Sequence, residues 1–242
     1  MPDKFDIIIV TPRAGRGIYY ESAEISRIAM LQFTHERGYR VATKNIWGAN
    51  IAQNRTNGIK SALEQYQTKW VFFVDDDMVV PQDCIIRMIE ADKDIVSGFC
   101  VMRKKPFTPC AWLHDKNNPK FYKPISEWSD DSLVKVDAVG GACMLVKTEV
   151  FKNIKRPWFH FYSDRDMDMG EDVFFCRKAK RKGYDIWLDT GLIIGHVGDC
   201  AYTIYDYLSY REQQESLKKR IVTNGFSAGH IIKPSPLITV NR

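Results

Sequence analysis

A short apolar segment that ends in three consecutive carboxylates is the strongest constraint on the fold of this chain. Residues 71–74 are β-branched or aromatic, and Asp75, Asp76 and Asp77 follow them directly. Such a segment is typical of a central strand in an α/β sheet, where ligands bind beyond the carboxyl ends of the strands. The pattern therefore predicts an α/β fold with acidic side chains at its ligand-binding edge.

The three aspartates have two interpretations. Like charges this close repel one another, and a hard divalent cation held by oxygen ligands would relieve the repulsion. Asp75 and Asp77 would then form an Asp-x-Asp pair on the ion. The alternative is a polar loop whose aspartates make turns and cap the next helix. The sequence leaves both interpretations open.

Strands and helices alternate in the first half of the chain, which predicts a mainly parallel sheet. Strands are expected at 6–10, ending in a turn at Thr11 and Pro12, and at 39–43 and 95–102, with helices at 21–37, 51–66 and 82–91. Asn50 is a suitable N-cap for the second helix. The second half has predicted strands at 108–113, 133–146, 185–188 and 192–194, with a turn at 189–191, and this indicates a mixed sheet.

Three features of the second half supply candidate functional residues. Gly140 and Gly141 interrupt an apolar segment, either because the backbone approaches a ligand or because a β-bulge forms. Glu171 and Asp172 open a helix, where acids stabilise the macrodipole and where a carboxylate can accept a proton from a hydroxyl. His196 stands between two glycines at a strand end, as a metal ligand or as a hydrogen-bonded structural residue.

Length and composition narrow the class of protein. The 242 residues suffice for one substantial α/β domain, and a net charge of +5 is too small for a dedicated nucleic-acid binder. The N-terminus has no signal-peptide pattern and no apolar segment is long enough to span a bilayer, so we expect a soluble cytoplasmic protein. Six cysteines without C-x-x-C spacing are expected to be reduced core residues. The basic clusters 103–105 and 177–182 are either solvated surface or phosphate contacts.

Four motifs in this order resemble the metal-dependent glycosyltransferases of the GT-A fold, particularly the family-two-like nucleotide-sugar transferases. They are 7–12, 74–77, 139–146 and 170–175, and the resemblance spans about 5–198. It implies a GT-A type Rossmann-like α/β/α sandwich, with a mainly parallel central sheet and a mixed-sheet acceptor half. Residues 1–198 would form the glycosyltransferase domain, with a nucleotide-binding half at about 1–102 and an acceptor half at about 103–198. A C-terminal helix and an extended tail would occupy 199–242.

The resemblance also implies a role for individual residues. Asp172 would be the general base, and Glu171 would bind hydroxyls of the donor or the acceptor. The metal, Mn²⁺ or Mg²⁺, would be held by Asp75, Asp77 and His196. The nucleotide sugar would contact Thr11, Pro12, Arg13, Asn54, Arg55, Asp75, Asp76, Gly140 and Gly141.

The implied activity is transfer of a sugar from a nucleoside-diphosphate sugar to a hydroxyl, with inversion of configuration. The acceptor is open: a glycan, a small molecule, a protein or a nucleic acid. Nucleotidyl or phosphoryl transfer also uses paired aspartates and a metal, but segment 13–17 matches only part of a phosphate-binding loop. A non-catalytic module that binds a sugar nucleotide or a glycan is the third possibility. The amphipathic helix expected at 205–223 is a candidate surface for a homo-oligomer.

Overall fold

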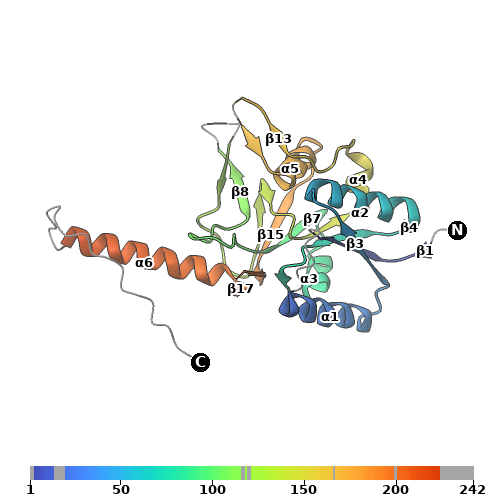
Figure 1. Ribbon diagram of the computed structural model, residues 1–242, viewed down its shortest axis with the longest axis horizontal. Coiled ribbons are helices and arrows are strands. Elements are labelled where there is room, and N and C mark those ends of the chain that lie inside the picture. Colours follow the sequence, from blue (N-terminus) through green and yellow to red (C-terminus); the bar gives the residue numbers. More distant parts are fainter. Residues whose placement is uncertain are drawn as a thin grey trace.

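The computed structural model describes residues 3–13, 20–115, 118, 121–165, 167–198 and 201–223. At its centre is a seven-stranded sheet (Figure 1). Its spatial order is β10 (Leu133–Val136), β15 (Ile186–Ile193), β7 (Ile95–Phe99), β12 (Cys143–Lys147), β5 (Trp70–Val74), β2 (Ile7–Arg13) and β3 (Val41–Trp47). Only β10 and β12 run against the other strands of this sheet. The predicted α/β fold with a mainly parallel sheet is confirmed.

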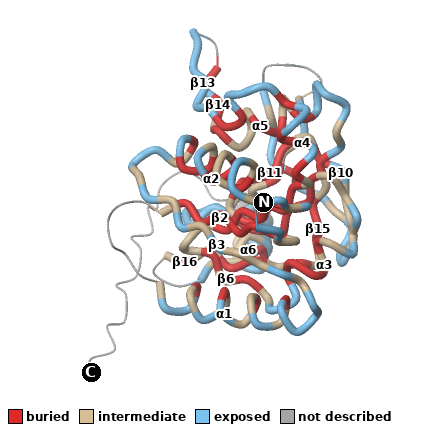
Figure 2. The backbone as a smooth tube through the Cα atoms, turned by 90° about the vertical axis from the view of Figure 1, so that its right-hand side faces the viewer, coloured by how far each residue is buried: buried red, intermediate tan, exposed pale blue. Residues whose placement is uncertain are grey.

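Helices cover both faces of this sheet (Figure 1). Helices α1 (Glu21–Glu36) and α3 (Cys84–Glu90) lie on one face, and α2 (Ile51–Gln65), α4 (Thr148–Asn153) and α5 (Glu171–Arg181) lie on the other. Alternation along β2 explains the two layers, because successive side chains of a strand point to opposite faces. Ile7 and Ile9 pack in the cluster that contains Met30 of α1, and Ile8 packs in the cluster that contains Ile59 of α2. Figure 2 shows this buried interior as red tube.

Short strands form small sheets around the central one. Strands β8 (Ala111–His114), β9 (Tyr122–Pro124) and β11 (Ala138–Val139) make an antiparallel sheet. The mixed sheet predicted for the second half is found in the central sheet, where β10 and β12 are antiparallel to their neighbours and β15 is parallel to β7. Strand β6 (Met78–Val79) pairs with β16 (Gly195–Val197), which pairs with β17 (Ala201–Tyr202). Two further pairs are β1 (Asp3–Lys4) with β4 (Tyr66–Gln67), and β13 (Tyr162–Ser163) with β14 (Asp168–Met169).

The turn predicted at Thr11 and Pro12 is wrong, because β2 continues to Arg13. Strand β2 pairs with β5 only as far as Val10, but it pairs with β3 as far as Arg13. Beyond Val10 it therefore has one neighbouring strand, and proline is tolerated where a ladder hydrogen bond is not required on both sides. The strand delivers Arg13 to the carboxyl-end edge of the sheet.

Two predictions in the second half are also wrong. Residues 133–146 form three strands, since the chain turns at Gly140 and Gly141 to leave the sheet of β8 and enter the central sheet as β12. The turn predicted at 189–191 is instead part of β15, whose register on β7 shifts between Asp189 and Ile193. Helix α4 was not predicted, because six residues are too few to show a helical period.

The C-terminal helix α6 (Ile204–Thr223) packs on the domain through its beginning. Ile204 is buried, Tyr207 and Tyr210 pack against the core, and Arg211 donates a hydrogen bond to the Ser126 carbonyl at 2.7 Å. The helix then extends away from the domain (Figure 1). Within the described ranges, no helix is long and apolar enough to cross a membrane. The tail expected after this helix lies outside the described residues.

Candidate active site

A buried arginine joins two of the predicted site motifs. Arg55 lies on the sheet-facing side of α2, and its side chain is only 2% exposed. Its Nη2 donates to both carboxylate oxygens of Asp75, at 2.8 and 2.9 Å, and its Nη1 donates to Glu171 Oε1 at 2.5 Å. Arg55 therefore cross-links the end of β5 to the beginning of α5.

Gly141 provides the space for this guanidinium. A Cβ atom at Gly141 would lie 2.9 Å from Arg55 Nε and 3.0 Å from Cζ. The same Nε is buried and has no hydrogen-bond partner among the described residues. The close contact at Gly141 is therefore with a protein side chain, Arg55, and the approach of a ligand to the glycine pair stays a prediction.

Two carboxylates compete for the single cation. Burial, together with the charges of Asp77 and Asp76, raises the pKa of Asp75 to about 6 against the opposing effect of Arg55. Burial and the charge of Asp172 likewise raise the pKa of Glu171 to about 6. The cluster is therefore short of positive charge, which favours the approach of a cation to the aspartates.

Asp77 and His196 form a second pair at the same edge. The Val101 carbonyl lies 2.8 Å from His196 Nδ1, which must carry the hydrogen because a carbonyl only accepts. His196 Nε2 then faces Asp77 Oδ2 at 3.4 Å, and Arg103 Nη1 is 3.2 Å from the same oxygen. Burial lowers the pKa of His196, but its hydrogen bonds to Asp77 and Val101 outweigh this and raise it. Burial raises the pKa of Asp77, yet His196 and Arg103 bring it below its ordinary value.

The donor atoms of this pair fit a divalent cation. Two ligands about 2.1 Å from an octahedral ion lie about 3 Å apart, close to the separation of His196 Nε2 and Asp77 Oδ2. The hydrogen bond at Nδ1 fixes the ring in the orientation that a metal ligand needs. Asp75 is instead turned to Arg55, and within the described part of the chain no three His, Cys, Asp or Glu side chains converge as a metal cage. Ions such as Mg²⁺ are commonly held by one or two protein ligands and completed by substrate phosphates.

Asp172 lies beside this cluster without a cationic partner among the described residues. Its Oδ1 accepts from its neighbour, the Val173 N–H, at 2.7 Å, and its Oδ2 is 3.4 Å from the Gly141 N–H. A Cβ atom at Gly140 would lie 3.8 Å from Oδ2, so the glycine turn borders this carboxylate. Asp172 is half-buried and Glu171 is buried.

The residues at the end of β2 form a separate part of this edge. Thr11 and Arg13 line a pocket of about 90 Å³ beside α1, and Arg13 Nε donates to Asn45 Oδ1 at 3.1 Å. Pro12 is buried. Asn54 does not join the acidic cluster: its Nδ2 donates to the Gly48 carbonyl at 3.0 Å, which fixes the loop before α2.

The sequence analysis did not identify Arg27 as a residue of this edge, and it left two interpretations of Arg103. Arg27 is buried, donates to the backbone carbonyl of Asp75 at 3.2 Å and pairs with Glu24. Its spacing could have identified it, because Arg27 follows Ala23 by four residues and precedes Met30 by three, which places it on the inward face of α1. Arg103 was expected as either surface or a phosphate contact, and the structure puts it against Asp77. Most of segment 13–17, the partial phosphate-loop match, lies outside the described residues.

Comparisons with known proteins agree with this architecture. The family model described as Glycosyltransferase like family 2 matches residues 25–214, so the chain belongs to this family. A comparison with curated proteins gives no match.

Solved structures are similar to this chain at low sequence identity. A197 from STIV is 16% identical, with 80% of this chain and 86% of that chain covered and a TM-score of 0.52. The catalytic domain of Drosophila beta1,4galactosyltransferase 7 in complex with xylobiose is 17% identical, with 81% and 71% covered and a TM-score of 0.47. The inositol-1-phosphate CTP transferase from T. maritima is 12% identical, with 81% and 89% covered and a TM-score of 0.45. The predicted GT-A fold and the family-two-like resemblance are confirmed.

Proposed function

We propose that the protein transfers a sugar from a nucleoside-diphosphate sugar to an acceptor hydroxyl, in a reaction that depends on Mn²⁺ or Mg²⁺. The observation that carries this proposal is the pairing of Asp77 with His196, at 3.4 Å, on the same sheet edge as the Asp75–Arg55–Glu171 network. A nitrogen and an oxygen ligand, next to a cluster with excess negative charge, suit a cation that also binds phosphate oxygens. Family membership supports the same class of reaction.

The residues have distinct roles in this proposal. Asp77 and His196 would hold the cation, which stabilises the charge that develops on the departing diphosphate. Arg103, whose side chain is 44% exposed beside Asp77, would contact the same phosphate groups. Asp75 would hold Arg55 in place and would contact the nucleotide. It follows β5 directly and precedes Asp77 by two residues.

Asp172 is the better candidate for the general base. Glu171 is engaged by Arg55, whereas the contacts of Asp172 are two backbone N–H groups. Asp172 would accept the proton of the acceptor hydroxyl as that oxygen attacks the anomeric carbon, with inversion of configuration. The Gly140–Gly141 turn borders this carboxylate, and the transferred sugar would lie against its backbone.

Thermal unfolding of the full chain tests the metal and the donor. Unfolding midpoints would be measured with UDP, GDP and CDP, each with Mn²⁺, Mg²⁺ or EDTA. A nucleotide at a hundredfold excess over its dissociation constant adds about 2.7 kcal/mol of stability. We expect a shift for one nucleotide that requires the metal and is lost in Asp77→Asn but kept in Asp83→Asn, an exposed aspartate at the beginning of α3. If no nucleotide gives a metal-dependent shift, the proposal is wrong.

Turnover separates catalysis from binding. In Asp172→Asn the transfer rate should fall by about 10² to 10⁴, the usual contribution of a general base, while metal-dependent nucleotide binding persists. An unchanged rate would exclude Asp172 as the base. Nucleotide binding without release of sugar or nucleotide, with any acceptor or with water, would indicate the binding module instead.

A further inference from the structure

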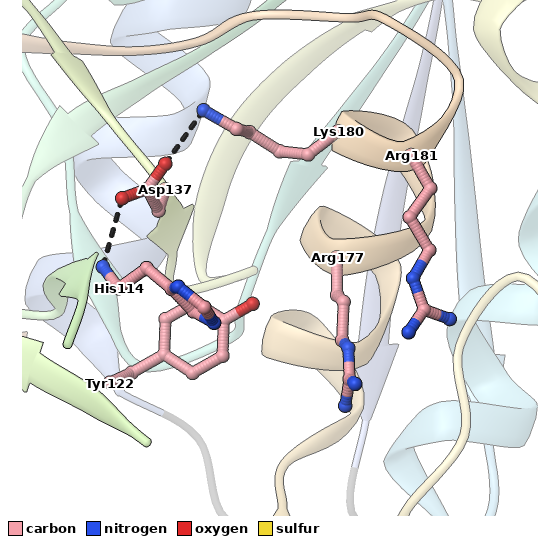
Figure 3. Close-up of a pocket in the computed structure, with 6 residues that line it drawn as sticks. All are labelled: His114, Tyr122, Asp137, Arg177, Lys180 and Arg181. Carbon is pink, nitrogen blue, oxygen red and sulfur yellow. Dashed lines mark hydrogen bonds and ion pairs between the residues drawn. The ribbon is translucent and has the colours of Figure 1, made fainter. Parts of the chain in front are cut away.

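A basic pocket lies along α5, on the acceptor half of the protein. It has a volume of about 430 Å³ and is open to solvent. Helix α5 forms one wall with its cationic side chains, and β8, β9 and the residue before β11 form the other (Figure 3). The lining residues are His114, Tyr122, Asp137, Arg177, Lys180 and Arg181.

The charges of this pocket do not balance. Asp137 is the carboxylate among the lining residues, and it already binds Lys180 Nζ at 2.6 Å and the backbone N–H of His114 at 2.8 Å. Burial raises the pKa of Asp137, but these two donors outweigh it and hold the pKa below its ordinary value. Neither Arg177 nor Arg181 makes an ion pair with any described residue. Two guanidinium groups are therefore left without a compensating carboxylate.

Helix stability does not explain both arginines. Lys178, Lys180 and Arg181 belong to the last turn of α5, where cations favour the macrodipole. Arg177 precedes that turn and is half-buried, and Arg181 follows it by four residues on the same helix face. Like charges at this spacing repel each other on a helix. Their side chains project towards the pocket, and the Tyr122 hydroxyl points across it towards Arg177 (Figure 3).

The basic pocket shares a wall residue with a second pocket near the beginning of α5. Asp172 and Arg177 are both on α5, where five residues correspond to about 8 Å along the helix axis and to about 140° of rotation, so the two side chains point to different sides of the helix. A second pocket of about 150 Å³, lined by Trp112, Val173 and Gly170 among others, lies near the beginning of α5. Tyr122 lines both pockets. Tyr122 therefore joins the basic pocket to a pocket beside the first turn of α5, the turn that also carries Asp172.

We propose that Arg177 and Arg181 bind an anionic group, a phosphate or a carboxylate, on the acceptor while its hydroxyl is presented at Asp172. Guanidinium groups recognise both anions through paired hydrogen bonds, and Tyr122 adds a hydroxyl donor. Burial raises the pKa of Tyr122, so this hydroxyl stays protonated. The role of the anion in an acceptor rests on the proposed function, but the binding of an anion does not.

Binding is tested without nucleotide or metal. Glucose 1-phosphate and glucuronate would be titrated into the full chain at constant ionic strength, with glucose as the neutral reference and binding followed by calorimetry. The variant is Arg177→Gln with Arg181→Gln. Its control, Arg37→Gln with Lys152→Gln, removes the same charge from two exposed positions, the C-cap of α1 and the last turn of α4.

We expect at least a tenfold weaker affinity in the pocket variant and none of that loss in the control. A preference for the phosphate or for the carboxylate identifies the acceptor group. The inference is wrong if the wild-type chain binds neither anion better than glucose, or if the pocket variant binds them as well as the control does.

The two proposals can fail separately. If the sugar anions bind and depend on the arginines, while no nucleotide gives a metal-dependent shift, the pocket stands and the transferase proposal falls. With an acceptor that carries the preferred anion, the pocket variant should raise the acceptor KM at least tenfold and leave kcat and the nucleotide affinity unchanged. A loss of kcat at unchanged acceptor KM would contradict an acceptor-binding role for the pocket.

Discussion

Arg55 shows how one side chain can determine the charge and the geometry of a site. Its guanidinium binds two carboxylates from different elements, and the pKa of each is still raised to about 6 by burial. A lysine ammonium is a point charge and cannot present parallel donors to Asp75 and a further donor to Glu171. The planar guanidinium also fits against Gly141, where any larger residue would press on Nε.

Replacement of Arg55 by methionine should destabilise the protein by about 3–5 kcal/mol, because it leaves the buried Glu171 and the half-buried Asp75 without their cation. Urea denaturation of the full chain measures the change. The triple variant Arg55→Met, Asp75→Asn and Glu171→Gln, which also removes the buried negative charges, should regain part of the loss. Arg156→Met is the control: this arginine is 53% exposed, pairs with Glu64 at 3.6 Å, and should cost no more than about 1 kcal/mol. Equal losses at Arg55 and Arg156 would contradict this account.

At the scale of elements, the position of α2 depends on its contact with β2. Arg55 reaches the acidic cluster only because α2 packs closely on the sheet, and Gly58 is at the point of contact. A Cβ atom there would lie 2.3 Å from Val10 Cγ1 and 3.0 Å from Cγ2. Val10 is fully buried and pairs with both neighbouring strands, so it has little freedom to move away.

Gly58→Ala should therefore destabilise the protein, although alanine is the better helix former by about 1 kcal/mol. The clash with Val10 resembles the insertion of a methyl group into a packed core, which costs about 1–3 kcal/mol. Asn57→Ala, at an exposed position of the same helix, should stabilise slightly by the propensity effect. Thermal or urea unfolding of both variants gives the comparison. A stabilised Gly58→Ala would show that α2 does not depend on this contact.

Elements with a strong periodic pattern in the sequence were predictable. Elements whose conformation depends on pairing with distant strands were not. The strand before Asp75, the helices at α1, α2 and α5, and the Asn50 cap followed from local patterns. The turn expected at 11–12 does not form because β3 pairs with these residues, and at 189–191 the chain stays in β15 with a register shift on β7 instead of a turn. The acidic motifs were identified as candidates, but the contact between Arg55 and Glu171 joins residues 116 apart and has no local signal.

At the scale of the whole molecule, the two halves of the chain are interleaved in one sheet. Strand β12, from the second half, lies between β7 and β5 of the first half, and β7 has β12 and β15 as its neighbours. The site is interleaved in the same way, because Asp75 and Asp77 come from the first half while Glu171 and His196 come from the second. The nucleotide-binding half and the acceptor half expected from the sequence would therefore be regions of one candidate site rather than separable folding units.

A fragment of residues 1–102 should consequently fail to fold. Without β12, the strands β5 and β7 lose their common neighbour, and Val71 and Phe73, which are fully buried in the intact chain, lose the side chains of the second half that cover them. Most small domains unfold as a single cooperative unit, and the shared sheet gives the full chain a physical reason to do so. Circular dichroism and calorimetry of the fragment and the full chain test this. We expect no cooperative transition for the fragment. For the full chain we expect a single transition, in which all elements up to α6 unfold together. A cooperative melt of the fragment would mean that β2, β3, β5 and β7 with their helices carry enough buried apolar surface to fold alone, and the candidate-site edge would then be assembled by docking of two folded halves.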